Sequence, residues 1–259
     1  MDKVSSVWLK VWLLVAALVV PSVAAALDFL AATPVGSWQV REEATTDHKG
    51  RQSVAVVRTS MVGQESRGAD THYWIEVELT NYQVKKGKRK QQGERSIIKV
   101  LVAEAALTRD PGDVMTNLRG IGSEIIMQTG DQQPMRISGG GAMADAMLQA
   151  MGTQMEYDFQ QGGAKEVTVP AGTFKCEVQR GSGYTEMKVM FKTFRVESEA
   201  EMCFSTEVPF GIVASQSKNT TNGDTSATEV TLLEFGASGA ESKISGEPSE
   251  APSLPNLFN

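Results

Sequence analysis

Hydrophobic side chains recur at every second position through most of the chain, which is the spacing of β-strands that bury one face. In the clearest run, residues 73–80, Tyr, Ile, Val and Leu alternate with Trp, Glu, Glu and Thr. The carboxylates of this run, Glu76 and Glu78, are expected on the solvent-facing side of a strand. Further alternating or β-branched runs lie at 38–40, 54–62, 98–102, 173–178, 187–191, 204–208, 212–217 and 228–235.

Turn-forming stretches separate these runs, and their shortness makes consecutive strands hairpin neighbours. They lie at 47–50, 85–93, 180–183 and 219–224. Hairpin neighbours imply an antiparallel meander rather than parallel strands joined by helices. We therefore expect a mainly β fold over residues 27–240, a curved antiparallel sheet or incomplete β-barrel of about nine to eleven strands with a short helical cover.

A short phrase recurs between the strands. Pro34, Pro170 and Pro209 each begin Pro-x-Gly, followed two residues later by a large apolar side chain. Proline presets φ at the second position of a turn, and glycine suits the fourth. Each copy is therefore expected to begin a strand.

The middle of the chain departs from the strand pattern, and a helical insertion is expected at about 138–152. After a glycine-rich lead, Met143, Met147 and Met151 lie four residues apart and share one helix face. This face has three interpretations: a plain cover for the sheet, a pliable lid over an apolar ligand, or a Cu(I) site. Copper is the weakest of them, because the helix lacks Met-x-Met or Met-x-x-Met spacing and a nearby histidine.

The first residues have the build of an export signal. Lys3 and Lys10 precede or begin an uncharged run, 11–20, that has half the length a bilayer-spanning helix needs. Small residues follow, so that cleavage is expected near Ala24 or Ala26, and no cysteine stands there for lipid attachment. We expect residues 1–26 to be a cleaved Sec-type signal peptide and the mature protein to be periplasmic or secreted.

Net charge and composition limit the classes of partner that the protein is expected to bind. The formal net charge of −6 disfavours nucleic acid, which normally needs a basic face. The tail, 241–259, is rich in Gly, Ser, Glu and Pro and is expected to be disordered. One basic cluster in a predicted hairpin is either a solvated tip or a contact for an anionic membrane surface or an acidic protein. Its members are Lys85, Lys86, Lys88, Arg89 and Lys90.

The two cysteines, Cys176 and Cys203, leave a question open. A simple meander with one strand between them would separate them by about 9.6 Å, too far for a disulfide. An oxidising compartment favours pairing all the same. A disulfide would therefore mean that the simple arrangement of strands is wrong.

The sequence contains few candidate catalytic or metal-binding residues. The histidines, His48 and His72, fall in a predicted turn and at a strand start. No Gly-x-Ser-x-Gly elbow and no His-x-x-His or Cys-x-x-Cys spacing occurs. We expect no catalysis, no metal and no cofactor.

The order of elements resembles the periplasmic lipoprotein-carrier superfamily, the LolA/LolB-like half-barrels, and related exported β domains. The local matches are Val-Thr-Val-Pro-Ala-Gly-Thr-Phe-Lys-Cys at 167–176 and Val-Pro-Phe-Gly-Ile-Val at 208–213. The resemblance spans about 34–240 and implies a curved sheet around an apolar hollow that holds acyl chains under helical lids. The helical part is shorter than a carrier's lids, and no lipoprotein-handling residue set matches.

These observations lead to a hypothesis and an alternative. The hypothesis is a non-catalytic protein that binds a lipid, a lipoprotein acyl chain or another apolar group in the concavity of the sheet. The alternative is a structural or adaptor protein of the cell envelope with a packed interior. The expected ligand-lining residues are Met143, Met147, Met151, Trp74 and Phe191.

Overall fold

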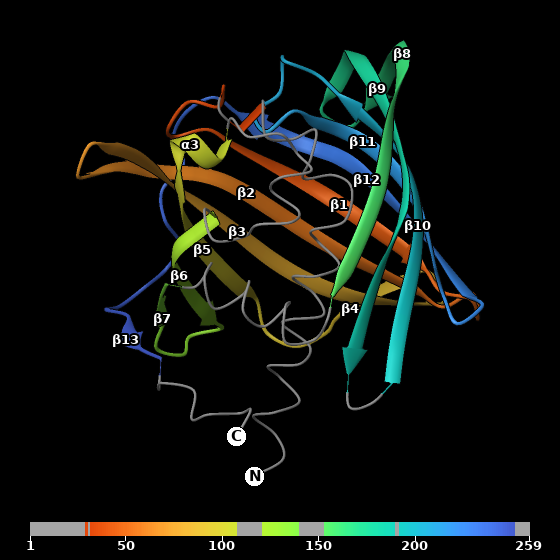
Figure 1. Cartoon of the computed structure of the whole chain (residues 1–259), viewed down its shortest axis with the longest axis horizontal. Coiled ribbons are helices and arrows are strands. Elements are labelled where there is room, and N and C mark those ends of the chain that lie inside the picture. Colours follow the sequence, from red (N-terminus) through yellow and green to blue (C-terminus); the bar gives the residue numbers. More distant parts are fainter. Residues whose placement is uncertain (1–28, 31, 108–120, 140–152, 190–191, 252–259) are drawn as a thin grey trace.

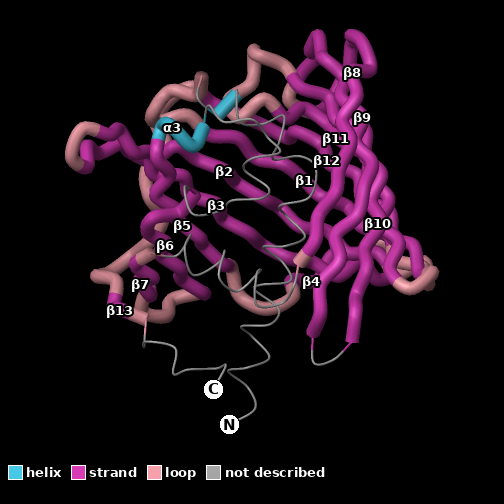
Figure 2. Tube along the Cα trace, in the orientation of Figure 1, coloured by secondary structure: helices cyan, strands magenta, loops and turns pink. Residues whose placement is uncertain are grey.

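The computed structural model describes residues 29–30, 32–107, 121–139, 153–189 and 192–251. Strands predominate among them, and the helix α3 is four residues long (Figure 2). The elements are β1 (Trp38–Thr46), β2 (Gln52–Arg67), β3 (Asp70–Lys85), β4 (Lys88–Gln91), β5 (Ser96–Ala103), α3 (Glu104–Leu107), β6 (Ile121–Thr129), β7 (Met135–Ser138), β8 (Gln154–Val169), β9 (Gly172–Val189), β10 (Lys192–Phe204), β11 (Ile212–Thr221), β12 (Asp224–Gly236) and β13 (Ser249–Glu250).

The strands form one 13-stranded sheet in the order β13-β7-β6-β5-β3-β2-β1-β12-β11-β10-β9-β8, with β4 paired to β3. In Figure 1 the sheet curls, so that β8, β9 and β10 stand in front of the far ends of β1, β2 and β3. The two ends of the sheet, β8 and β13, do not pair with each other. The expected mainly β fold with an open, curved sheet is confirmed, although the sheet has 13 strands rather than about nine to eleven. Of the helical insertion expected at about 138–152, Ser138 ends β7 and residues 140–152 lie outside the described residues.

The local strand predictions hold where the pattern was clearest. The alternating run 73–80 lies inside β3. The three Pro-x-Gly phrases directly precede or enter β1, β9 and β11, which begin at Trp38, Gly172 and Ile212. Proline and glycine thus set the points where the chain enters the sheet.

The stretch 180–183, expected to be a turn, lies instead in the middle of the 18-residue strand β9. A Cβ on Gly183 would collide with the backbone carbonyl of Glu156 on β8, so glycine is what lets the two strands approach. Because β9 is continuous, Cys176 and Cys203 lie on neighbouring strands with their Cα atoms 5.3 Å apart, and they form a disulfide. The expected intervening strand is wrong, and the antiparallel order of the meander is retained.

Alternation along the strands gives the sheet two distinct faces. Ile75 of β3 shares one face with Met61 of β2, Val100 of β5 and Ile125 of β6. We call this the inner face, because α3 packs on it, on the concave side in Figure 1. The opposite, outer face carries Glu76 of β3 and its register neighbours.

The segment after β12 crosses the outer face. Glu76 is 3% exposed, and its carboxylate accepts hydrogen bonds from Ser242 Oγ (2.6 Å) and from the Lys243 backbone N–H (2.7 Å). The buried Gln128 of β6 exchanges hydrogen bonds with Ser245 in both directions, at 3.0–3.2 Å. Farther along, β13 pairs in parallel with β7.

These contacts correct two expectations. Glu76 is not on a solvated face, because the chain's own tail covers it. The tail is ordered through Ala251, because hydrogen bonds to buried side chains and to β7 offset the entropy that its composition alone could not. Residues 252–259 lie outside the described part of the chain.

The disulfide lies in an apolar core cluster formed by β9, β10, β11 and β12. Cys176 and Cys203 are 1% and 2% exposed and pack with Phe174, Val213 and Leu232. Phe29, at the start of the described chain, stacks on Phe204 with ring centroids 5.4 Å apart. The strands β9–β12 thus carry their own apolar core.

Candidate functional site

The inner face of β3, β5, β6 and β7 is an apolar surface that is only partly covered. Register pairs place Val77 opposite Ile98, and Ile98 opposite Met127. These side chains are neither fully buried nor freely exposed, unlike the sealed residues on the outer face. The half-buried members of this inner apolar face are Tyr73, Ile75, Val77, Ile98, Val100, Ile125, Met127 and Met135.

One end of this inner apolar face is closed by local structure. Ala106 and Leu107 of α3 are 2% and 1% exposed and pack with Val102 of β5. Leu30 and Tyr73 lie against the same cluster. The surface is therefore anchored at one end and extends from there along the concave side of the sheet.

Not all residues expected to line the concavity do so. Trp74 alternates with Tyr73 and Ile75 and lies on the outer face, so the expectation for it is corrected. Its indole Nε1 donates to Glu65 Oε2 at 3.0 Å, and the Lys99 ammonium lies 4.9 Å from the ring centroid. Four other expected lining residues lie outside the described part of the chain: Met143, Met147, Met151 and Phe191.

The inner face also carries a polar row that the sequence pattern did not identify. Gln39, Arg41 and Glu43 of β1 point to the inner side, because Gln39 pairs with Thr59 and Arg41 with Val57. The sequence suggested the reverse, since Trp38 and Val40 are the apolar members of that strand. No signal in the sequence revealed it, because the side to which β1 turns Arg41 depends on the pairing of β1 with β2 and β12.

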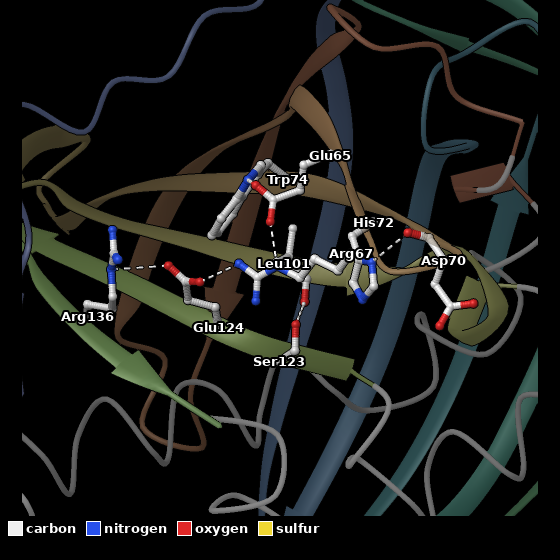
Figure 3. A network of polar contacts seen from close by, with 9 residues as sticks. All are labelled: Glu65, Arg67, Asp70, His72, Trp74, Leu101, Ser123, Glu124 and Arg136. Atoms are coloured by element: carbon white, nitrogen blue, oxygen red, sulfur yellow. Dashed lines mark hydrogen bonds and ion pairs between the residues drawn. The ribbon is translucent and has the colours of Figure 1, made fainter.

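On the outer face, charged side chains of β2, β6 and β7 and the Trp74 indole of β3 form a network of polar contacts (Figure 3). Arg67 of β2 donates to Glu65 Oε1 and to Glu124 Oε2 of β6, both at 2.6 Å. Arg136 of β7 pairs with the other oxygen of Glu124 at 3.1 Å. The indole and the Arg67 guanidinium hold the pKa of the Glu65 carboxyl below its usual range. Each carboxylate is neutralised by its neighbours, an arrangement that fixes strands rather than one that moves protons.

The histidines do not assemble a reactive centre with these groups. His48 lies in the β1–β2 turn, with Nε2 3.6 Å from Asp224. His72 is on β3, and its Nδ1 lies 3.4 Å from the backbone carbonyl of Asp70. Among the described residues, no group of three or more His, Cys, Asp or Glu side chains is arranged to hold a metal ion.

A hollow of about 480 Å³, open and polar, lies over β9–β12. It is lined by Glu197, Glu199, Lys218 and Tyr184 among others, and the Arg195 guanidinium lies 3.8 Å from the Tyr184 ring centroid. Such a lining does not suit an acyl chain, because charged groups would lose hydration without gaining partners.

The predicted basic cluster forms the tip of the β3–β4 hairpin. Lys86 and Gly87 make the turn, with φ values of 51° and 74°, and Lys85 is directly opposite Lys88. Arg89 is exposed as well, but its charge is neutralised, because its two Nη atoms bind both carboxylate oxygens of Glu42 on β1, at 2.7 and 2.8 Å. The exposed basic tip is therefore Lys85, Lys86, Lys88 and Lys90.

No helix in the described part of the chain has the length and apolar character needed to cross a membrane.

Comparison with known proteins yields only distant structural likeness. No protein-family model matches the chain, and no curated protein matches it. A "putative lipoprotein" from Parabacteroides distasonis is 14% identical with a TM-score of 0.39, covering 79% of this chain and 96% of its own. A "putative exported protein" with a YmcC-like fold from Bacteroides fragilis is 9% identical with a TM-score of 0.36, covering 79% and 97%. Both scores are too low to carry an argument about function, and neither points to the LolA/LolB-like carriers in particular.

Proposed function

We propose that this protein binds a lipid or another long apolar ligand on the inner apolar face, without catalysing a reaction. The observation that carries the proposal is the set of half-buried aliphatic side chains on β3, β5, β6 and β7. Soluble proteins seal such side chains or use them for binding, since each carries an apolar area whose burial contributes about 1.5–3 kcal/mol.

The contrast between the two faces supports this proposal. On the outer face Ile97 and Leu101 are sealed, at 1% and 0% exposure. Their neighbours on the same strand, Ile98 and Val100, stay half-buried on the inner face. The same strand therefore has a completed face and an incomplete one, and the incomplete face lies on the concave side, where a ligand would be enclosed.

The test is binding of a fluorescent long-chain fatty acid to the purified chain, with native mass spectrometry to detect a co-purified lipid. Val77→Thr combined with Val100→Thr keeps side-chain shape and places two hydroxyls in the binding surface. Affinity is expected to fall about tenfold or more, because each hydroxyl loses hydration when the ligand covers it.

The matched control is Val56→Thr combined with Val84→Thr, the same chemical change at half-buried positions on the outer face of β2 and β3. That variant is expected to bind as the original chain does. An empty protein that binds no probe would contradict the proposal and favour the adaptor alternative, in which the interior is fully packed.

A further inference from the structure

The polar row of β1 adjoins the inner apolar face. Register pairs run from Arg41 through Val57 of β2 to Leu79 of β3, so the guanidinium and the apolar strands share one concave surface. On its other side Arg41 is opposite Leu232 of β12, which is 0% exposed. An arginine is thus set among apolar neighbours in the bend of the sheet.

Arg41 is poorly satisfied where it stands. Its side chain is 12% exposed, and burial lowers the pKa of its guanidinium, with Glu43 acting in the opposite sense. The nearest carboxylate oxygen, Glu43 Oε1, is 3.9 Å from Nη2, which is beyond hydrogen-bond range. Arg41 Nε has no hydrogen-bond partner among the described residues, and the same holds for Oε1 of the buried Gln39 beside it.

A buried cation with an unused donor requires an explanation, because folded proteins satisfy nearly all such groups. The guanidinium presents N–H donors in a plane that matches a carboxylate with two parallel hydrogen bonds. A singly charged carboxylate suits the site better than a phosphate dianion, because Glu43 already places a negative charge 3.9 Å away.

We propose that Arg41 binds the carboxylate of a long-chain fatty acid whose hydrocarbon chain lies on the inner apolar face. This assignment rests on the proposed function and names the ligand class for it. From β1 to β6 the sheet order passes through β2, β3 and β5, a distance of about 19 Å at about 4.8 Å per strand. That distance is comparable to the length of a long acyl chain, whose path passes the inner side chains of β2, where Val57 and Met61 are already covered.

The test compares two ligands with the same hydrocarbon chain and different head groups, palmitate and hexadecanol, by equilibrium dialysis. The original chain is expected to bind palmitate at least tenfold more tightly. Arg41→Met should weaken palmitate binding about 30-fold, the value of a hydrogen-bonded charge, and leave hexadecanol binding unchanged. Arg58→Met is the control, since Arg58 lies on the outer face over the Trp38 ring.

Stability provides a second readout. Because the Arg41 guanidinium makes no hydrogen bond to its ionic neighbour Glu43, Arg41→Met should keep the melting temperature close to that of the original chain, which distinguishes a lost ligand contact from a damaged fold. Equal affinity of the original chain for both ligands would overturn the assignment alone. Binding of neither ligand would overturn the proposed function and the assignment with it.

A different observation carries a second inference, at the exposed basic tip. The Lys85–Lys88 pair sets two like charges directly opposite each other across a β-ladder, which is destabilising. Lys86 occupies a left-handed position, φ 51°, where the corresponding turn between β11 and β12 has Asn222 at 53°. Among the described residues no carboxylate contacts Lys85, Lys86, Lys88 or Lys90, whereas Asp47 neutralises Arg51 in the neighbouring β1–β2 turn.

The geometry points to an anionic phospholipid bilayer as the partner of this basic tip. Lysine is unfavourable for the folding of the hairpin at positions 85, 86 and 88, so we attribute these lysines to their charge rather than to folding. Protein interfaces favour arginine and aromatic anchors and are poor in lysine, and the single arginine here is bound to Glu42. Flexible lysines suit the diffuse negative charge of a membrane surface, and the net charge of −6 turns the rest of the molecule away from it.

Co-sedimentation with vesicles of phosphatidylcholine containing phosphatidylglycerol tests this docking. Binding is expected at low salt, with loss in high salt and on vesicles of phosphatidylcholine alone. Lys86→Gln with Lys88→Gln should weaken binding about 25-fold, at about fivefold per lysine, while the exposed pair Lys175→Gln with Lys218→Gln should leave it within twofold. Equal losses in both double variants, or no vesicle binding by the original chain, would overturn the docking, and capture of an acidic protein instead would assign the tip to that partner.

Discussion

Reduction of the Cys176–Cys203 disulfide should destabilise the protein by an amount that follows from its position in the chain. The bridge closes a loop between residues 27 apart in sequence. Loop-closure entropy for that separation corresponds to about 3.5 kcal/mol at 25 °C. For a chain of this size about 1 kcal/mol shifts the melting temperature by about 2–4 °C, so the expected loss is about 7–14 °C.

The assay is thermal unfolding followed by circular dichroism. Because both sulfurs are buried, at 1% and 2% exposure, the protein is unfolded and refolded with a phosphine reductant before the measurement. The double variant Cys176→Ala with Cys203→Ala is the control and should melt at the same temperature with and without reductant. A shift below about 2 °C in the original chain would refute the bridge as a stabilising element between β9 and β10.

Three further predictions concern single side chains. Glu76→Ala should speed hydrogen exchange of the Lys243 amide at least tenfold, because the buried carboxylate is its acceptor; unchanged exchange would mean that the tail is held elsewhere. Gly183→Ala should lower the free energy of unfolding in urea by about 2 kcal/mol or more, because its Cβ meets the Glu156 carbonyl, and a neutral result would contradict the close strand approach. The Glu65 carboxyl has a pKa held below 4.5, chiefly by the indole and then by a guanidinium, so its stabilisation is complete above pH 4.5 and is lost as pH falls through the lower folded-state value. Glu65→Gln should flatten that part of the acid-unfolding curve, and an unchanged curve would contradict the contact.

The strand pattern of the sequence predicted much of the sheet, because a two-residue period is a local property of the chain. The run 73–80 and the three Pro-x-Gly strand starts needed no knowledge of the tertiary structure. The error in β9 also has a local origin. Glycines that normally mark a turn were read as one, whereas Gly183 serves the approach of β8, a contact that only the pairing of strands reveals.

The outer face could not be predicted, because its partner is distant in sequence. Glu76 is buried by the segment around Lys243, some 167 residues later. A polar, proline-containing tail has no periodicity that would announce such docking. Its order comes from a few hydrogen bonds to buried side chains and from the short parallel pairing of β13 with β7.

The sequence predicted the apolar character of the candidate site but not the residues that form it. The sequence indicated an apolar concavity and named Trp74, which the alternation of β3 places on the outer face instead. It did not identify Arg41, because the choice of inner side for β1 depends on which face the tail covers. For the basic cluster the sequence was sufficient except at Arg89, whose carboxylate partner lies on β1.

The central claim is that a lipid lies on the inner apolar face, and methyl NMR with a saturating fatty acid tests it most directly. Neighbouring isoleucines on opposite faces provide matched reporters, because Ile98 and Ile125 are inner while Ile97 and Ile126 are sealed on the outer side. The methyl signals of Ile98 and Ile125 are predicted to shift strongly and those of Ile97 and Ile126 to shift little. Equal shifts on both faces, or none on the inner face, would contradict the account.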